Sequence, residues 1–460
     1  MALAPHSLAR WQAELAAGRT TSRALAEHAL AAATSGGEAR ATFVAVHAEA
    51  ARASADAADR LRAGGVPLPP LAGIPISIKD LFDEAGQVTR CGSRVLEEAA
   101  PAASDSIAVQ RLRAAGAVIV GRTNMTEFAY SGLGLNPHYG TPRNPWDRAT
   151  GRIPGGSSSG AAVSVTDGMA AAAIGSDTGG SVRIPSAFCG LTGFKPTARR
   201  VSLDGVAPLS ASLDSVGPLA RTVACCALLD AVLAGEPVRP LRPLPLAGAR
   251  LALPATLVTD GMDATVAAAF DAACRTLAAA GASIVELPIP EFAELAHINR
   301  LGGFTAAESW AWHARLVEEQ GEGYDPRVVS RIRRGASMTA AAYIELLAER
   351  KRWIAGVQAR LADAQVQAMV MPTVPVVAPP IAPLEKDDAL YGSTNLLVLR
   401  NPTFINFLDG CALSLPCHRA GDAPVGLMLA APCGHDARLL ALGAAAEAAL
   451  GTSKGAPNGR

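Results

Sequence analysis

The segment 151–196 constrains this chain more than any other, because it carries two clusters of glycine and hydroxyl residues. The first cluster, GGSSSG, occupies 155–160, and the second, GSDTGGS, occupies 175–181. The segment between them contains no lysine, arginine, histidine or aromatic residue. Because glycine lets the backbone approach other backbone or a ligand closely, the two clusters can bring hydroxyls and free N–H groups to one place. This pattern predicts a serine-based active site.

The composition of the whole chain narrows its class. The 460 residues are 50% hydrophobic, which is enough to bury a large core in two or three domains or in one large α/β unit. The 41 basic and 41 acidic residues balance, which argues against a broad basic surface for nucleic acid. No stretch reaches the roughly 18 uncharged apolar residues of a membrane span. We therefore expect a cytoplasmic protein that binds no membrane and no nucleic acid directly.

The cysteines and histidines indicate no metal site. The eight cysteines form no CxxC pair, and no histidine spacing completes a zinc site. Scattered buried thiols in a reducing compartment are therefore favoured over a disulfide framework. We expect no cofactor, and a homodimer is mildly favoured for the assembly.

Apolar patterning predicts an α/β architecture with a largely parallel or mixed sheet. In the segment 71–80, Ile76 and Ile78 share one strand face while Lys79 lies on the other. Pro75 favours a strand start or an edge. Helices followed by short strands are expected at 105–115 with 117–120 and at 264–280 with 282–287, and further buried strands at 369–374 and 411–416.

The chain divides into regions of different character. Residues 1–62 are expected to be N-terminal helices, and 63–236 the catalytic core. Residues 291–364 read as mostly helical, and three of the five tryptophans in this region favour an aromatic core over a substrate-covering role. The tail 452–460 is predicted to be disordered.

A serine hydroxyl is a weak nucleophile, so the predicted site requires a base within hydrogen-bond reach. Residues 156–160 fit the G-x-S-x-G elbow, in which a downstream histidine is the base. The downstream histidines are His297, His313, His418 and His435. This alternative leaves the second cluster without a role.

Lys79 is the other candidate base. A lysine accepts a proton only when neutral, so its pKa must fall from about 10.4 toward 7 through burial or neighbouring positive charge. The apolar segment that ends at Lys79 makes a buried amine plausible. The carboxylate of Asp80 would oppose this fall if it faced the amine, but strand alternation places Asp80 on the opposite face.

Several segments together resemble the amidase signature family. They are 74–80 (IPISIKD), both glycine clusters with the second extended to 185, 121–128 (GRTNMTEF), 144–146 (NPW) and 424–428 (PVGLM). The likeness runs roughly from residue 20 to residue 450. The resemblance implies a single domain over 1–451, with a large mixed β-sheet core covered by helices on both faces and an added helical region.

The resemblance also implies a Ser–Ser–Lys triad. Ser181 matches the nucleophile that becomes acylated, Ser157 matches a bridging serine that follows a cis peptide bond, and Lys79 matches the base. We expect the flanking Asp177 and Arg183 to have structural rather than catalytic roles.

Further site residues follow from the same resemblance. The backbone N–H groups of Thr178, Gly179, Gly180 and Ser181 match an oxyanion hole, where bare backbone lets donors approach a tetrahedral oxygen. Ala129 matches a position that contacts substrate.

The implied activity is hydrolysis of a small-molecule amide, releasing a carboxylic acid and ammonia or an amine. Two alternatives lie within the same family. One is the glutaminase component of a tRNA-dependent amidotransferase, which needs a partner protein, and the other is a hydrolase of carbamate, urethane or allophanate type. A binding protein with an inactive site is disfavoured, because all three triad positions are present.

Overall fold

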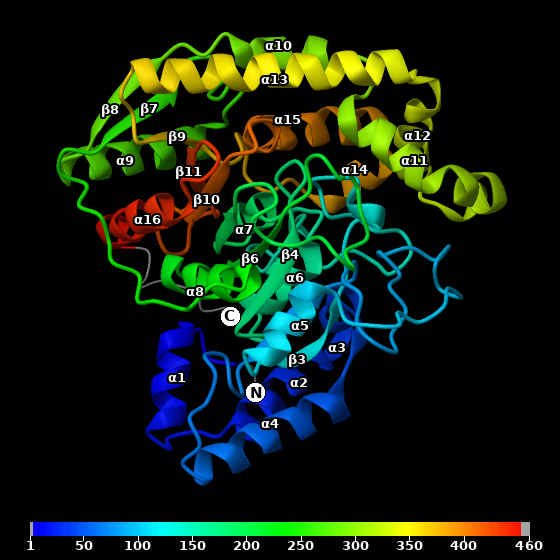
Figure 1. Cartoon of the computed structure of the whole chain (residues 1–460), viewed down its shortest axis with the longest axis vertical. Coiled ribbons are helices and arrows are strands. Elements are labelled where there is room, and N and C mark those ends of the chain that lie inside the picture. Colours follow the sequence, from blue (N-terminus) through cyan, green and yellow to red (C-terminus); the bar gives the residue numbers. More distant parts are fainter. Residues whose placement is uncertain (1–2, 452–460) are drawn as a thin grey trace.

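A computed structural model describes residues 3–451, so the predicted disorder of the tail 452–460 lies outside the described residues. Its centre is one mixed sheet of eleven strands in the order β1-β3-β2-β4-β6-β5-β10-β11-β9-β7-β8 (Figure 1). The strands are β1 (Phe43–Val46), β2 (Pro75–Lys79), β3 (Val118–Thr123), β4 (Ala172–Ser176), β5 (Thr192–Lys195), β6 (Val216–Ala220), β7 (Arg250–Pro254), β8 (Ser283–Leu287), β9 (Ala368–Pro372), β10 (Cys411–Pro416) and β11 (Gly426–Ala431).

Helices surround this sheet. The α-helices are α1 (Leu8–Ala16), α2 (Ser22–Ala33), α3 (Gly36–Thr42), α4 (Ala48–Ala63), α5 (Ile107–Ala114), α6 (Ser159–Thr166), α7 (Arg183–Phe188), α8 (Val223–Ala234), α9 (Ala264–Ala279), α10 (Glu291–Ile298), α11 (Gly303–Gln320), α12 (Pro326–Arg333), α13 (Ala340–Asp363), α14 (Ile381–Lys386), α15 (Asp388–Phe407) and α16 (Asp436–Leu450). Short 3-10 turns are η1 (Glu127–Ala129), η2 (Gly321–Gly323) and η3 (Arg334–Ser337).

Alternating residues of the sheet face two separate parts of the core. On β10, Leu413 and Leu415 pack in the larger cluster, which includes α8 and α16, whereas Ala412 packs in a second cluster with residues of α10, α13 and α15. Successive side chains of a strand point to opposite faces. Helices therefore cover both faces of the mixed sheet, as expected.

The sequence predicted most of the elements that surround the site. The expected strand around Lys79 is β2, and Pro75 is its first residue; the alternative of an edge strand is wrong, since β2 pairs with both β3 and β4. The expected helix–strand pairs are α5 with β3 and α9 with β8, and the two later strands are β9 and β10.

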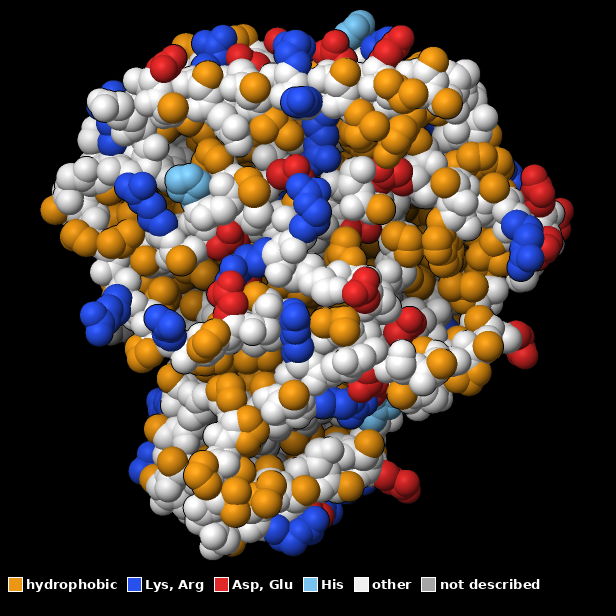
Figure 2. Space-filling model, viewed as in Figure 1, with side chains coloured by type: hydrophobic (Ala, Val, Ile, Leu, Met, Phe, Trp, Pro, Cys, Tyr) orange, Lys and Arg blue, Asp and Glu red, His pale blue; other side chains and the backbone are white. Residues whose placement is uncertain are grey.

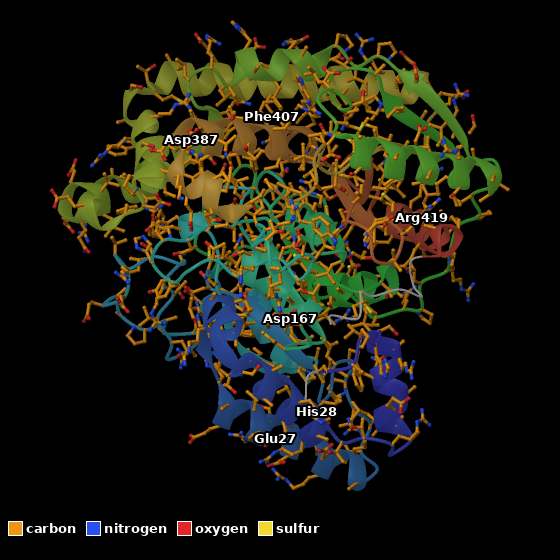
Figure 3. All side chains as sticks on the ribbon, turned by 180° about the vertical axis from the view of Figure 1, so that it is seen from behind. Glu27, His28, Asp167, Asp387, Phe407 and Arg419 are labelled. Atoms are coloured by element: carbon orange, nitrogen blue, oxygen red, sulfur yellow. The ribbon has the colours of Figure 1, made fainter. Side chains whose placement is uncertain are left out.

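The region 291–364 is helical and contains α10 to α13, as predicted. Figure 1 shows α10 and α13 along one end of the molecule, opposite α1, α2 and α4. Trp353 of α13 is fully buried against Phe292 and Phe407, which confirms an aromatic core there, whereas Trp312 of α11 is 42% exposed. Asp387, which caps the start of α15, and Phe407 mark the two ends of that helix (Figure 3).

The surface agrees with the balanced charge of the sequence. Figure 2 shows basic and acidic side chains interspersed over the visible face. Within residues 3–451, no helix combines the length and the apolar character needed to cross a membrane.

Candidate active site

Lys79 is the last residue of β2 and is completely buried. The parallel pairing of β2 with β3 and β4 keeps this strand away from the sheet edge. Ile76 and Ile78 join the larger core cluster, while Lys79 projects from the other face of the strand. Its Nζ donates to Ser157 Oγ at 2.7 Å and to Ser176 Oγ at 2.8 Å.

Ser157 lies in the loop before α6, and the Gly156–Ser157 peptide bond is cis. The Ser157 carbonyl accepts the Thr126 N–H at 3.1 Å. A Cβ at Gly156 would lie 2.5 Å from Gly134 N, so only glycine fits this close approach. This packing places the Ser157 hydroxyl against the Lys79 amine.

Ser181 lies on the loop between β4 and α7, and the carboxylate of Asp177 organises that loop. This carboxylate accepts two backbone N–H groups of the loop, at 2.9 and 3.1 Å. Arg183 donates to both of its oxygens, at 3.0 and 2.8 Å. The Ser181 carbonyl accepts the Ser158 N–H at 3.3 Å. The second glycine cluster is therefore folded around a buried ion pair and held beside the first.

The helix α15 supports the same loop. Asn406 Nδ2 donates to the carbonyl and to Oδ1 of Asp177, each at 2.9 Å. The Oδ1 of the same side chain accepts from Arg183 at 2.6 Å. Burial alone would raise the pKa of Asp177, but the Arg183 guanidinium, together with Lys195 and the hydrogen bond from Asn406, holds this pKa well below its usual range. Asp177 therefore remains ionised and able to accept these hydrogen bonds.

Burial lowers the pKa of Lys79 to about 7, although the carboxylates of Asp214 and Asp177 act in the opposite direction. Asp80 faces away from the amine, as strand alternation predicts. Its carboxylate accepts from Arg122 Nε at 2.7 Å. A substantial fraction of Lys79 is consequently neutral near pH 7 and can accept a proton.

A cavity of about 280 Å³ opens onto Ser181 and is lined also by Thr178 and Gly179. Within residues 3–451, the backbone N–H groups of these three residues meet no acceptor. Gly180 differs from the sequence-based expectation of a fourth free donor, because its N–H donates to Asp177 and the residue does not line the cavity. Three unpaired N–H donors therefore belong to residues of the cavity wall.

Ala129, which the resemblance matches to a substrate-contacting position, also lines this cavity. Its φ is +60° and that of Phe128 is +48°, so two adjacent non-glycine residues adopt the left-handed conformation there. The histidine alternative gains no support in the described part of the chain. None of the four downstream histidines lines the cavity, and His313 hydrogen-bonds to Tyr324 instead.

Sequence reasoning missed several residues of the site. Ser176, the second partner of Lys79, ends β4 next to the end of the parallel strand β2, and this arrangement of strand ends could have identified it. Asn406 lies 229 positions from Asp177, and no local pattern connects them. Three polar residues of the cavity wall, Arg331, Arg334 and Asn395, were also missed.

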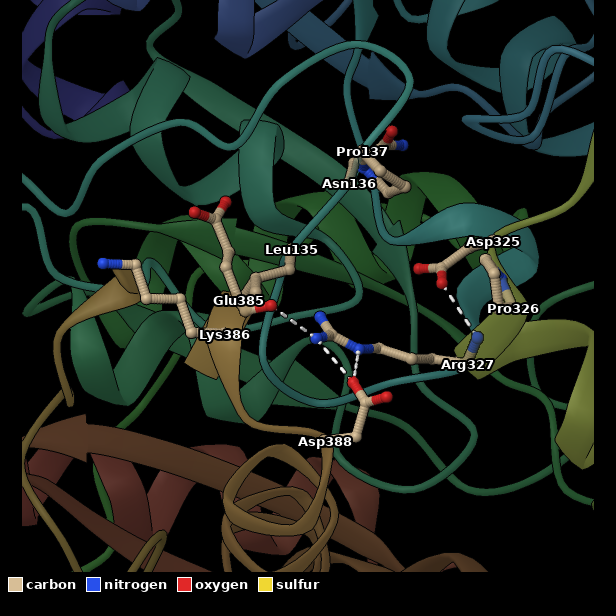
Figure 4. A pocket seen from close by; sticks show the side chains of 9 residues that line it. All are labelled: Leu135, Asn136, Pro137, Asp325, Pro326, Arg327, Glu385, Lys386 and Asp388. Atoms are coloured by element: carbon tan, nitrogen blue, oxygen red, sulfur yellow. Dashed lines mark hydrogen bonds and ion pairs between the residues drawn. The ribbon is translucent and has the colours of Figure 1, made fainter. Parts of the chain in front are cut away.

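A larger cavity of about 540 Å³ lies elsewhere, between α12, α14 and the loop around Asn136 (Figure 4). Two of its charged side chains form an ion pair, and a third caps a helix. Arg327 contacts the Asp388 carboxylate at 2.7 Å and the Glu385 carbonyl at 2.8 Å, and Asp325 caps α12. No predicted triad residue lines this cavity.

Comparison with known proteins agrees with this geometry. A family model described as Amidase matches residues 24–440. A 2-amino-5-chloromuconic acid deaminase from Comamonas testosteroni is 39% identical over 87% of this chain and 87% of its own. The A component of a glutamyl-tRNA(Gln) amidotransferase from Synechococcus sp. (strain WH7803) is 35% identical and covers 92% and 93%. A solved amidase structure superposes with a TM-score of 0.86 and 33% identity over 96% of this chain and 99% of that chain. The chain therefore belongs to the amidase family and is an amide hydrolase.

Proposed function

We propose that this chain hydrolyses a small amide through an acyl-enzyme on Ser181, with Ser157 as proton relay and Lys79 as base. The observation that carries the proposal is the 2.7 Å hydrogen bond between a fully buried amine and the Ser157 hydroxyl. Full burial of a lysine is usually accompanied by a charged partner. Lys79 instead pairs with two hydroxyls, and burial brings its pKa to about 7.

The first chemical step forms the acyl-enzyme. Ser181 Oγ bonds to the amide carbonyl carbon, its proton passes to Ser157 Oγ, and the Ser157 proton passes to neutral Lys79 Nζ. The carbonyl oxygen becomes an oxyanion, which the N–H groups of Thr178, Gly179 and Ser181 stabilise.

The same relay then runs in reverse. Protonated Lys79 returns a proton through Ser157 to the amide nitrogen, the C–N bond breaks, and ammonia or an amine leaves. A water molecule attacks the ester carbon and gives its proton to the relay. The relay protonates Ser181 Oγ as the carboxylic acid departs, which restores the starting state.

Ser176 and Gly180 have supporting roles in this scheme. The Ser176 hydroxyl, 2.8 Å from Lys79 Nζ, accepts one N–H of the neutral amine and leaves its lone pair directed to Ser157. Gly180 gives its N–H to Asp177 and so fixes the turn that presents the neighbouring donors.

The similar proteins favour two classes of substrate. The Comamonas relative is named as a deaminase of an organic acid, which supports ammonia as the released product. A glutaminase that works within an amidotransferase is the second candidate, supported by 35% identity to the A component of such an enzyme over 92% of the chain. Activity on glutamine that appears only after a partner protein is added would favour this second candidate.

The test is a panel of primary amides, aryl anilides, glutamine and carbamates, assayed for release of ammonia or amine. Ser181→Ala and Lys79→Ala are each expected to lower kcat by at least about 10³-fold. Ser158→Ala is the matched control, because Ser158 is the central serine of the elbow pattern and has no role in the proposed chemistry. Loss of activity in Ser158→Ala with retention in Ser181→Ala would overturn the assignment.

A further inference from the structure

The cavity over Ser181 carries two arginines and no carboxylate among its lining residues. Arg331 lies near the end of α12, and Arg334 follows in η3. Side chains three residues apart on a helix lie on the same side, so the two guanidiniums share one face. The wall of this cavity is therefore cationic.

Arg331 is held in place by its neighbours. Its Nη1 donates to the Tyr130 carbonyl at 2.6 Å, and its guanidinium carbon lies 5.3 Å from the centre of the Tyr391 ring. Such contacts fix the orientation of the charged group before any ligand binds. The second arginine is not satisfied in this way. Arg334 is exposed at the cavity, and within residues 3–451 its guanidinium makes no hydrogen bond and no ion pair.

Asn395 supplies a third donor. It is only 4% exposed, and its Oδ1 accepts the Gly132 N–H at 2.9 Å and the Ser131 hydroxyl at 2.8 Å. Because a backbone N–H can only donate, these contacts identify the side-chain oxygen. The amide nitrogen of Asn395 meets no acceptor in the described residues, although the side chain lines the cavity. This nitrogen is not sealed inside the protein, so it can donate to an acceptor that a ligand brings into the cavity.

The nearest carboxylates do not neutralise this wall. Glu308 is occupied by the hydroxyls of Ser210, Ser212 and Tyr343. Asp214 accepts from Thr178 and from two backbone N–H groups. Neither carboxylate lines the cavity. Two guanidiniums and an amide N–H therefore face a cavity whose wall contains no carboxylate.

We infer that this cavity binds a carboxylate on the acyl part of the substrate, and that Arg334 is a specificity-determining residue. The guanidinium fork matches a carboxylate with two parallel hydrogen bonds. The substrate class is then a monoamide of a dicarboxylic acid. This inference rests on the proposed function, because the acyl part occupies the cavity only if Ser181 attacks the amide.

The first experiment compares monoamides of dicarboxylic acids, from malonamate to adipamate, with neutral primary amides of the same chain length. The carboxylate substrate of the best length is expected to have a kcat/KM at least about 10-fold above that of its neutral partner. Arg334→Gln is expected to remove most of this preference. Asn395→Asp, which keeps both acceptor contacts but replaces the donor with a negative charge, should also lower it.

Arg333→Gln is the matched control, because Arg333 is exposed and extends toward Gly321 rather than into the cavity. This variant is expected to keep the full preference for the carboxylate substrate.

A binding measurement separates this inference from the proposed function. The same monoamides are titrated by calorimetry into Ser181→Ala protein with and without Arg334→Gln. A Kd that weakens about 10-fold on loss of Arg334 supports the inference, even if no amide is hydrolysed and the proposed function fails. Hydrolysis without preference for the carboxylate, or preference and binding unaffected by Arg334→Gln, overturns it.

Discussion

Lys79 is a fully buried amine whose hydrogen-bond partners are two hydroxyls. Burial disfavours the charged form, so the pKa falls to about 7 from an ordinary value of 10.5. The folded protein therefore holds fewer protons on this group than the unfolded chain does between roughly pH 7 and pH 10. The resulting cost to stability is full below pH 7 and disappears as the pH rises through this window.

The first prediction concerns the pH dependence of catalysis. Since the free enzyme must hold Lys79 neutral, kcat/KM should rise with unit slope at acid pH and level off above an apparent pKa near 7. An ordinary lysine would shift this limb to about pH 10.4. The measurement is kcat/KM for one amide from pH 5 to pH 10, and a flat profile over this range would contradict the role of Lys79.

The second prediction concerns stability. Lys79→Met removes the titrating amine, so the wild-type protein should gain stability relative to this variant as the pH rises. The difference in free energy of unfolding should change by roughly 3–4 kcal/mol between pH 7 and pH 10. Guanidinium unfolding of both proteins at the two pH values measures it. A difference that stays constant with pH would show that the amine is not perturbed.

For individual residues, the sequence predicted the features that depend on neighbouring positions in the chain. The alternation of the segment 74–80 predicted which faces Lys79 and Asp80 occupy. The glycine clusters predicted a serine-based site, and the family resemblance singled out Ser157 and Ser181 within them. The sequence could not predict Asn406, because this contact depends on how a helix far along the chain packs on the loop. It also could not predict that Asp177 takes up the N–H of Gly180, which depends on loop geometry.

At the scale of elements, the site depends on the packing of α15 against the loop that carries Ser181. Gly180 has a φ of +121°, and a Cβ there would lie 2.5 Å from Pro402 Cβ of α15. The conformation and the close contact both require glycine at this position. The loop and the helix must therefore fit each other closely.

The third prediction follows from this contact. Gly180→Ala should lower kcat at least about 100-fold, because a misplaced oxyanion-hole donor alone costs about that much. The matched control is Gly392→Ala on α15, where a Cβ would meet nothing within 4 Å. This control should retain activity and gain about 0.5–1 kcal/mol of helix stability. Steady-state kinetics of both variants decide the question, and an active Gly180→Ala would contradict this account of the loop.

Sequence periodicity predicted the strands around the site, but it did not predict which other segments of the chain pack beside them. The strands β2 and β10 were predictable because residues that are buried in a sheet are mostly apolar, and this leaves a recognisable pattern in the sequence. The composition of α12 indicates a basic helix, but it does not say that Arg331 and Arg334 line the cavity over Ser181. That placement depends on tertiary packing between distant segments.

At the scale of the whole molecule, the helices α10, α13 and α15 form an aromatic layer over one face of the sheet. Trp353 is fully buried, stacks near Phe292 and donates its indole N–H to the Glu291 carbonyl. Arg350 of the same helix donates to the Phe407 carbonyl at 3.0 Å, at the end of α15. Packing and hydrogen bonds in this layer therefore hold α15, which supports the Ser181 loop, against α10 and α13.

The fourth prediction tests this layer. Trp353→Ala should destabilise the protein by about 3–5 kcal/mol, since it leaves a large cavity in the core. Leu347→Ala on α13 is the matched control, because Leu347 is 44% exposed, and its effect should stay within about 0.5 kcal/mol. Denaturant midpoints measure both changes. Equal effects of the two substitutions would contradict the assignment of Trp353 to the core.

In the proposed mechanism Ser181 carries the acyl group, and covalent labelling can identify the serine that reacts. The protein is treated with a fluorophosphonate, digested with trypsin together with a protease that cleaves before aspartate, and analysed by mass spectrometry. Trypsin alone leaves Ser157 and Ser181 on one peptide, whereas the added cuts before Asp167 and Asp177 separate them. We expect one adduct, within residues 177–183 at Ser181, which is absent from Ser181→Ala. An adduct within residues 153–166, or labelling that persists in Ser181→Ala, would contradict the proposed mechanism.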